Sequence, residues 1–212
     1  MEKEVVLNEI SRKGFDKEHF INLANQDEVF REFIVEEMIE NQSIMTYYNC
    51  FTVISKSCAS CPEYYYGYRE DFSHLLEHEN SYKRDFGLTL WAHLIPVDSE
   101  HHFDRIIANY LEHINDEKFM TGECCVKNLA EVLKHRPDLT DSVVEVLLNR
   151  RGKSRYSPKQ DALMDCYVLE VLEKVYNHSE HQTDINRFIL ESKDSLSPKT
   201  RKKAKEMLKH LG

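Results

Sequence analysis

Hydrophobic positions along the chain recur at the three-to-four-residue spacing of amphipathic helices. In the segment FREFIVEEMIE, Phe30, Phe33, Ile34 and Met38 form one apolar stripe, and residues 102–114 repeat the pattern. The segment 158–176 differs, because its apolar residues spread over most of the helix circumference. We expect such a helix to be covered by neighbours on several sides. The pattern as a whole predicts an all-α protein.

The same residues open two of these helical segments. Ser157-Pro158-Lys159 and Ser197-Pro198-Lys199 lie 40 residues apart, and serine followed by proline is typical of a helix start. Ser43 and Ser81, 38 residues apart, precede two earlier segments, and Asn115-Asp116 precedes a third. A period near 40 residues is typical of helical hairpins that stack in a solenoid.

The sequence therefore predicts pairs of helices joined by short turns. Residues 1–26 form capping helices, one over Lys3–Lys13 that ends at Gly14 and one from Asp16 to about Asn25. The expected hairpins pair 27–41 with 43–58, 62–79 with 81–95, 101–115 with 117–135, 139–149 with 158–176, and 183–193 with 198–211. Because no linker divides the chain, we expect one domain over 1–212, with the repeats in 27–212.

The start of one late helix can be laid over the start of an earlier one. Arg84, Gly87 and Trp91 align with Arg201, Ala204 and Leu208, which gives a basic residue, a small residue and a large apolar residue at the same spacing. In this pattern the chain resembles HEAT or armadillo-type helical repeats. The helices near 43 and 117 depart from it, because they lack the arginine. The resemblance implies a right-handed α-solenoid of about five to six antiparallel hairpins with a concave binding face.

Composition agrees with a folded helical chain. The sequence has only 6 glycines and 5 prolines, and 41% hydrophobic residues are too many for disorder. Its six cysteines fall mostly within helical patterns and are typical of core residues in a reducing compartment, so we expect a cytoplasmic protein. No apolar run reaches the roughly 18 residues of a membrane span, and the first ten residues are unlike a signal peptide. We expect no membrane partner.

Four residues have the spacing of a two-cysteine, two-histidine zinc finger. They are Cys58, Cys61, His74 and His78, and the tyrosine-rich run Tyr64–Tyr68 between them has strand propensity. A straight helix over 62–79 would instead separate Cys61 from His74 by about 20 Å. The two interpretations exclude each other: the tyrosines favour a zinc module, and the repeat register favours the helix.

Charge is distributed unevenly along the chain. Residues 1–149 carry a net charge of −14, and residues 150–212 carry +5, within a total of −9. Ten side chains form two basic clusters at matching places in successive repeats: Arg150, Arg151, Lys153, Arg155 and Lys159, then Lys199, Arg201, Lys202, Lys203 and Lys205. Merged along one edge, they would attract phosphate. In size, helical repeats and basic carboxyl end the chain is similar to HEAT-like DNA glycosylases for alkylated bases, which implies a nucleic-acid-binding alternative.

The chain contains no glycine-rich phosphate loop and no metalloprotease or serine-hydrolase motif, so we expect neither catalysis nor a cofactor. The favoured interpretation is a scaffold that binds a protein partner. Tyr47, Tyr48, Arg84 and Lys127 are the candidate docking residues, because we expect them to be exposed on the second helices of the hairpins. We expect Trp91, the only tryptophan, to lie in the core.

Overall fold

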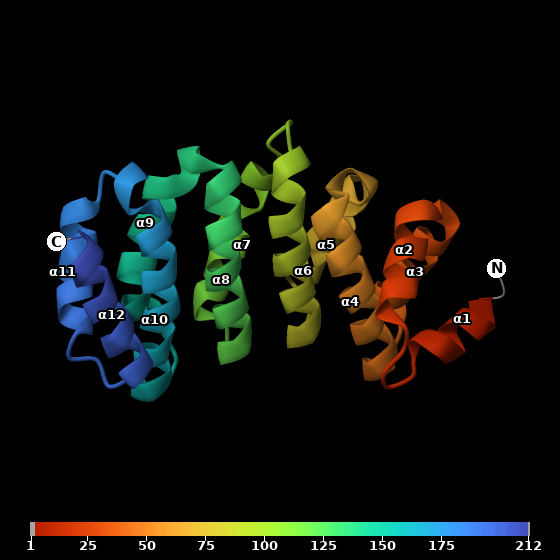
Figure 1. The fold of residues 1–212 in the computed structure, drawn as a ribbon, viewed down its shortest axis with the longest axis horizontal. Helices are drawn as coiled ribbons and strands as arrows, with labels where there is room; N and C mark the ends of the chain where they lie inside the picture. Colours follow the sequence, from red (N-terminus) through yellow and green to blue (C-terminus); the bar gives the residue numbers. More distant parts are fainter. Residues whose placement is uncertain (1–2, 212) are drawn as a thin grey trace. The chain divides into compact units, whose positions relative to one another are not determined.

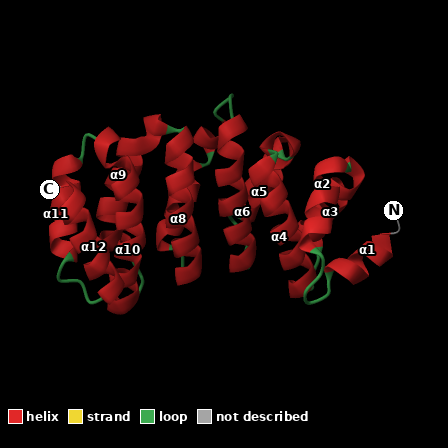
Figure 2. Cartoon of the chain, in the orientation of Figure 1, coloured by secondary structure: helices red, strands yellow, loops and turns green. Residues whose placement is uncertain are grey.

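The computed structural model describes residues 3–211, and every regular element within this range is an α-helix or a 3-10 helix (Figure 2). The prediction of an all-α protein is therefore confirmed. No helix in the described range is both long enough and apolar enough to cross a membrane. The chain divides into two compact units, Met1–Glu100 and His101–Gly212, whose helices are labelled in Figure 1. One continuous domain over 1–212 stays a prediction.

Within residues 3–100, the first unit contains six α-helices and three short 3-10 helices. They are α1 (Lys3–Ile10), α2 (Lys17–Gln26), α3 (Glu28–Glu40), α4 (Ile44–Ser60), η1 (Pro62–Tyr64), η2 (Tyr66–Tyr68), α5 (Arg69–Leu75), α6 (Ser81–Leu94) and η3 (Ile95–Val97). Helices α2, α3 and α6 begin at capping residues, which are Asp16, Asp27 and Asn80. Asp16 accepts a bond from the His19 N–H at 3.0 Å, and Asp27 accepts one from the Phe30 N–H at 3.0 Å.

Helix α4 lies at the centre of this unit, where it packs against α2, α3 and α6, and α6 packs in turn against α5. The apolar stripe predicted on α3 faces inward, since Phe30, Ile34 and Met38 are fully buried. Trp91 of α6 is buried as expected, and its indole N–H donates to Ser73 Oγ of α5 at 3.0 Å. The first unit is thus a layered stack of helices with a shared apolar interior.

The predicted helix over 62–79 is wrong in its extent. The segment forms η1, η2 and the short α5, and neither a straight helix nor a β-hairpin is present there. The Tyr65 hydroxyl donates to Ser57 of α4 at 2.7 Å, whereas the Tyr66 hydroxyl donates to Asp98 beyond α6 at 2.5 Å. These two anchors lie on different elements, and Gly67 beside them is a weak helix former, so short 3-10 pieces replace a regular helix.

The second unit contains the remaining helices. They are η4 (His102–Arg105), α7 (Ile107–Glu112), η5 (His113–Asn115), α8 (Phe119–His135), η6 (Pro137–Leu139), α9 (Thr140–Asn149), η7 (Arg150–Lys153), α10 (Pro158–Val175), η8 (Tyr176–His178), α11 (Gln182–Ser192) and α12 (Pro198–Leu211). The two Ser-Pro starts are confirmed: Ser157 forms a capping box with Gln160, and Ser197 Oγ accepts the Thr200 N–H at 3.3 Å.

The predicted helix over 101–115 is also interrupted. His101 has a left-handed backbone with φ 57°, which an α-helix cannot contain, and 3-10 turns lie on both sides of α7. At the far end, Asp116 binds the His113 ring at 2.9 Å and the Lys118 N–H at 2.8 Å. These local bonds end the helical segment before α8.

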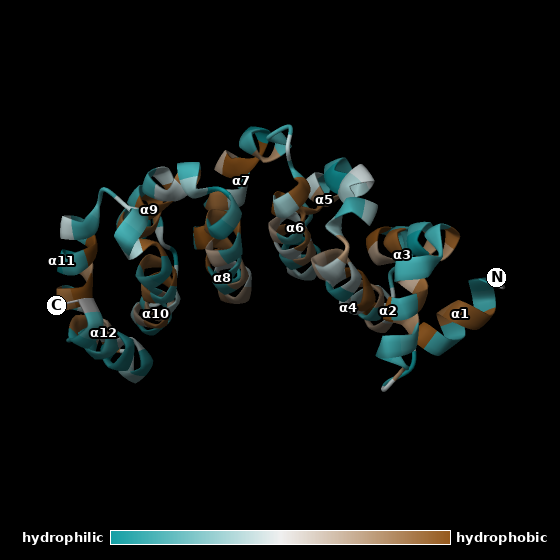
Figure 3. Ribbon diagram, turned by 45° about the horizontal axis from the view of Figure 1, so that its top comes forward, coloured by the Kyte–Doolittle hydropathy of each residue, from teal (hydrophilic) through white to brown (hydrophobic). Residues whose placement is uncertain are grey.

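Helix α10 is the centre of the second unit. It packs against α8 and α12 and also contacts α9 and α11, which confirms that its apolar surface is covered on several sides. Met164, Val168 and Leu172 are fully buried. Helix α12 is mostly polar, as its largely teal ribbon shows (Figure 3), and it contributes Ala204 and Met207 to the interior.

Four of the five longest helices in residues 3–211 share one register when each is counted from its first residue. In these four the third residue is buried, and the seventh is both small and buried. The third positions are Thr46, Lys83, Thr121 and Thr200, and the seventh positions are Cys50, Gly87, Cys125 and Ala204, in α4, α6, α8 and α12. In α10 the seventh residue is Met164. A small residue at one fixed place allows a neighbouring element to approach closely.

The aligned arginines also make the same bonds. Arg84 Nη1 donates to the carbonyls of His78 and Glu79, at 2.8 and 3.0 Å. Arg201 Nη1 donates to the carbonyls of Ser195 and Leu196, at 2.7 and 3.2 Å. Each arginine therefore binds the carbonyls six and five residues before it, in the turn that follows the preceding helix.

Candidate functional site

Four large apolar side chains are exposed together on α4 and α6. The exposed fractions are 63% for Ile44, 45% for Met45, 46% for Tyr48 and 48% for Tyr82. The rings of Tyr48 and Tyr82 meet edge to face with centroids 6.1 Å apart, which joins the two helices at the surface. We call these four residues the Tyr48 patch. Their exposure on adjoining helices makes this the candidate partner-binding surface of the first unit.

Aromatic rings beneath the surface hold Tyr48 in place. Phe51 and Phe86 stack with centroids 3.9 Å apart and planes 8° from parallel. The Tyr48 ring lies 6.2 Å from Phe51 and 6.0 Å from Phe86. Because the Tyr48 ring is packed on one side and exposed on the other, a partner that docks there would restrict this side chain little further.

The expectation that Tyr47 is exposed beside Tyr48 is wrong. Tyr47 is 3% exposed, its ring contacts Phe86 at 6.0 Å, and its hydroxyl accepts a bond from Asn80 at 3.1 Å. Both rings contact Phe86 of α6, but successive residues of a helix point about 100° apart, so Tyr47 lies within this contact and Tyr48 lies at its exposed edge.

Arg84 is likewise buried, at 7% exposure, because its guanidinium binds the carbonyls after α5. Its neighbour Lys83 is 3% exposed; its ammonium donates to the carbonyls of Met38 and Ile39 and lies 4.3 Å from the centroid of the Tyr47 ring. Burial lowers the pKa of Lys83. Both cations thus bind backbone carbonyls at the end of a helix or just beyond it. Neither presents its charge at the surface near the Tyr48 patch.

Lys127 of α8 is exposed, as expected. Its ammonium pairs with Glu123 one turn earlier and lies 4.6 Å from the centroid of the Tyr167 ring of α10. Lys199 of α12 approaches the same ring at 4.3 Å. Tyr167 thus binds a cation from each of the two helices that flank α10.

Five of the ten side chains in the two predicted basic clusters pair with carboxylates. Arg150 is 2% exposed and binds Asp161 at 2.9 Å as well as the buried Asp165, so it lies in the interior and not on a phosphate-binding surface. Arg151 also pairs with Asp165. Further pairs are Lys199 with Glu170, Lys202 with Glu206, and Lys203 with Glu173. The other members Lys153, Arg155, Lys159 and Lys205 are exposed.

The structure does not bring the four zinc-finger candidates together. Cys58 is fully buried within α4, Cys61 follows the end of that helix, and His74 is exposed on α5. The His78 Nδ1 atom accepts the Asn80 N–H at 2.9 Å. Among residues 3–211, no three His, Cys, Asp or Glu side chains are grouped so that they could hold a metal ion.

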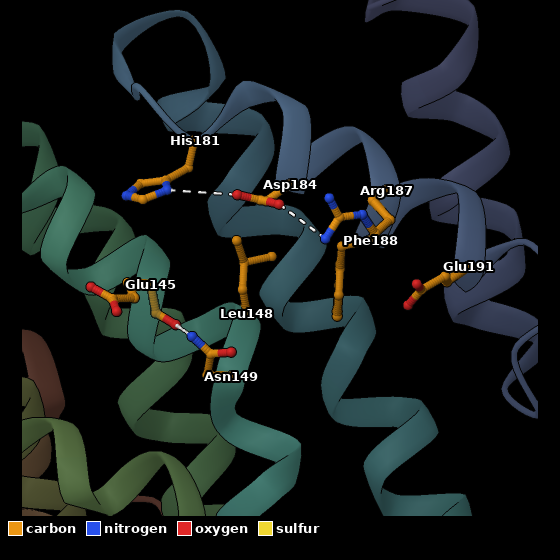
Figure 4. A pocket seen from close by; sticks show the side chains of 8 residues that line it. All are labelled: Glu145, Leu148, Asn149, His181, Asp184, Arg187, Phe188 and Glu191. Carbon is orange, nitrogen blue, oxygen red and sulfur yellow. Dashed lines mark hydrogen bonds and ion pairs between the residues drawn. The ribbon is translucent and has the colours of Figure 1, made fainter.

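An open depression of about 370 Å³ lies between α9 and α11 (Figure 4). The carboxylates of Glu145, Asp184 and Glu191 border it. Asp184 already pairs with Arg187 at 3.1 Å and lies 3.9 Å from His181. These pairs reduce the charge that the depression can offer to a cationic ligand, and the bordering side chains include no cysteine or serine nucleophile.

The sequence indicated Tyr48 but not the rest of its patch. Ile44, Met45 and Tyr82 give no signal by type alone, since large apolar residues are normally interior. The shared helix register could have found them, because Met45, Tyr82 and Met120 are the second residues of α4, α6 and α8, and all three are exposed.

No known protein-family model matches the chain, and no characterised protein matches it in sequence.

Proposed function

We propose that the chain is a non-catalytic scaffold of HEAT-like helical repeats that binds protein partners through the first turns of its long helices. In this proposal the hairpins of both units continue one right-handed solenoid, and the second position of each long helix lies on the binding face. The family resemblance and the solenoid are parts of the proposal.

The recurrence of one exposed position carries this proposal. The second helical residue is a large, exposed apolar side chain in three successive long helices: Met45 at 45%, Tyr82 at 48% and Met120 at 64% exposure. The third residue in each of these helices is buried. A burial pattern that repeats at fixed register is expected of stacked repeats, where equivalent positions line one continuous surface. Exposed methionine and tyrosine are typical of protein interfaces.

Charge pairing supports a protein partner over a nucleic acid. Six of the ten cationic side chains expected to contact phosphate are bound to carboxylates or backbone carbonyls, which leaves Lys153, Arg155, Lys159 and Lys205. Arg150 and Arg151 share the buried Asp165, and breaking that pairing to reach a phosphate would oppose binding, whereas the exposed lysine pairs contribute little.

Site-specific photocrosslinking tests the proposal. We expect benzoylphenylalanine placed at Tyr82 or Met120 to crosslink a defined protein in native extract. The same group at Leu190, which is 52% exposed on α11, should not crosslink that protein. Equal crosslinking from all three positions would contradict the proposal. So would salt-sensitive binding of duplex DNA that is lost when Lys153 and Arg155 are changed to glutamine.

A further inference from the structure

We propose that the Tyr48 patch is the docking site for a basic amphipathic helix of a partner protein. The inference rests on the proposed function and adds the chemistry of the partner. It draws on the spacing of the apolar anchors, on the rigidity of their support and on the sign of the surrounding charge.

The apolar anchors have the spacing that a helix requires. Ile44 and Tyr48 are one turn apart on α4, Met45 lies between them, and Tyr82 projects from the adjacent α6. A patch formed by two packed helices matches the apolar face of a third helix, whose anchors recur every three to four residues. Residues 3–211 contain no β-strand whose edge could pair with an extended peptide. A helix is therefore the form of segment that this surface fits.

The support beneath the patch is already ordered. The parallel stack of Phe51 on Phe86, at 3.9 Å, forms a base for the Tyr48 ring, and Phe86 is 1% exposed. Tyrosine presents a large contact area with few rotatable bonds, so holding it in advance reduces the entropic cost of binding. The methionine at position 45 can adapt to side chains of different shape.

The first unit has an excess of carboxylates, and two of them closely precede residues of the patch in the sequence. Residues 1–100 contain 19 Asp and Glu against 9 Lys and Arg, a net charge of −10. Glu40 and Glu79, both exposed, precede Ile44 and Tyr82 by four and three residues. Lys83 and Arg84, the cations that follow Tyr82, are turned inward to backbone carbonyls. The net charge of the unit and the carboxylates of Glu40 and Glu79 therefore favour a cationic partner, although the exposed Arg12 lies on the α1 side of α4, where Asn49 binds its carbonyl.

The same sign argues against other occupants. A nucleic acid or an anionic lipid surface would be repelled by the carboxylates. A second copy docking patch to patch would place two acidic surfaces face to face, because an isologous dimer pairs identical residues. A basic helix satisfies both the apolar anchors and the charge.

Two labelled peptides provide the test. The first is a helical peptide of about 16 residues with leucine on one face and lysine on the other, and the second peptide has glutamate in place of lysine. We expect the lysine peptide to bind the full chain in fluorescence anisotropy, with affinity falling as salt is raised. The glutamate peptide should bind at least about tenfold more weakly.

Variants of the chain separate the patch from general attraction to an acidic protein. Changing Tyr48 and Tyr82 together to alanine should weaken the lysine peptide about tenfold, because interface tyrosines are frequent hot spots. Changing Glu40 and Glu79 together to glutamine should weaken it several-fold and reduce its salt dependence. The matched control Leu190→Ala removes an equally exposed apolar side chain from α11 and should leave the affinity unchanged. Circular dichroism confirms that each variant is folded.

Three results would overturn the proposal: equal binding of the two peptides, an unchanged affinity in the tyrosine variant, or an equal loss in Leu190→Ala. Self-association of the chain that is abolished by Tyr48→Ala would also overturn it, since a second copy would then cover the patch. The docking site can fail while the proposed function stands. A partner that crosslinks at Met120 and is not displaced by the lysine peptide would support the scaffold function and contradict this docking site.

Discussion

Gly87 lets α5 and α6 approach each other closely, and replacing it with alanine should separate the two helices. A Cβ atom at this position would lie 2.8 Å from the Phe72 carbonyl oxygen. It would also lie 3.1 Å from both the Leu75 Cβ atom and the Leu76 Cδ2 atom. The nearest of these atoms belongs to the backbone, so a change of side-chain rotamer cannot relieve the contact. Helix α5 itself must move.

Two opposing effects set the size of the result. Alanine is favoured over glycine within a helix by about 1 kcal/mol. Overpacking a filled interior costs roughly 1–3 kcal/mol, and the upper part of this range applies where the backbone must shift. Phe72 and Leu75 are 0% and 2% exposed, so moving α5 also loosens buried contacts. We expect Gly87→Ala to lower the free energy of unfolding by about 1–2 kcal/mol.

The single tryptophan provides the assay. Trp91 is buried in α6 and donates a hydrogen bond to Ser73 of α5, so its fluorescence reports the packing of these two helices. In urea denaturation followed by this signal, the midpoint should fall while the slope stays unchanged. A thermal midpoint should fall by roughly 4–8 °C for each kcal/mol in a unit of this size.

Gly67 is the matched control. Among the described residues nothing lies within 4 Å of a Cβ atom built there, and its φ is not positive. Gly67→Ala should therefore leave stability unchanged or raise it slightly, because alanine restricts the unfolded chain. If Gly87→Ala proved as stable as Gly67→Ala, the argument that the small residue permits the close approach would be wrong.

Three further predictions concern buried charge and reactivity. Arg150→Met should lower the free energy of unfolding by about 2–3 kcal/mol in urea denaturation, because it removes the buried one of the two arginines that bind Asp165 and leaves Arg151; a loss below about 1 kcal/mol would contradict this. The backbone N–H of Glu180, followed by the Ser179 hydroxyl, holds the pKa of Asp141 below its usual 3.8, so this bond stabilises the fold above that pH and its contribution is lost on further acidification. Asp141→Asn should therefore flatten the fall of the thermal midpoint below about pH 4, and an unchanged acid profile would refute this assignment. Burial raises the pKa of four thiols, so iodoacetamide at about pH 8 should modify only the two half-buried cysteines of the native chain in mass spectrometry, and all six after denaturation. The protected thiols are Cys50 with a pKa of about 12, Cys166 with a pKa of about 11, and Cys58 and Cys125 with still higher values; the reactive ones are Cys61 and Cys124.

Close approaches between helices also explain a repeat signal that the sequence concealed. The alignment of Gly87 with Ala204 used residue size, but it passed over Cys50 and Cys125 at the same register. These cysteines are fully buried small residues, equivalent in place to the glycine and the alanine. The missing arginine in α4 and α8 made their helices look unrelated, although the small seventh position is the feature that packing constrains more strictly.

The sequence by itself determined the elements that depend on a few neighbouring residues. Ser157 and Ser197 begin α10 and α12 because a hydroxyl and a proline satisfy the first helical turn locally, and the stripe from Phe30 to Met38 fixes which face of α3 is buried. Only the tertiary structure decided that Tyr48 is exposed while Tyr47 is buried. Both rings contact Phe86, more than 30 residues along the chain, but the Tyr47 ring is also covered by Lys83 and its hydroxyl is bound by Asn80. Exposure is a property of contacts between distant segments, and local spacing does not specify which neighbour covers which side chain.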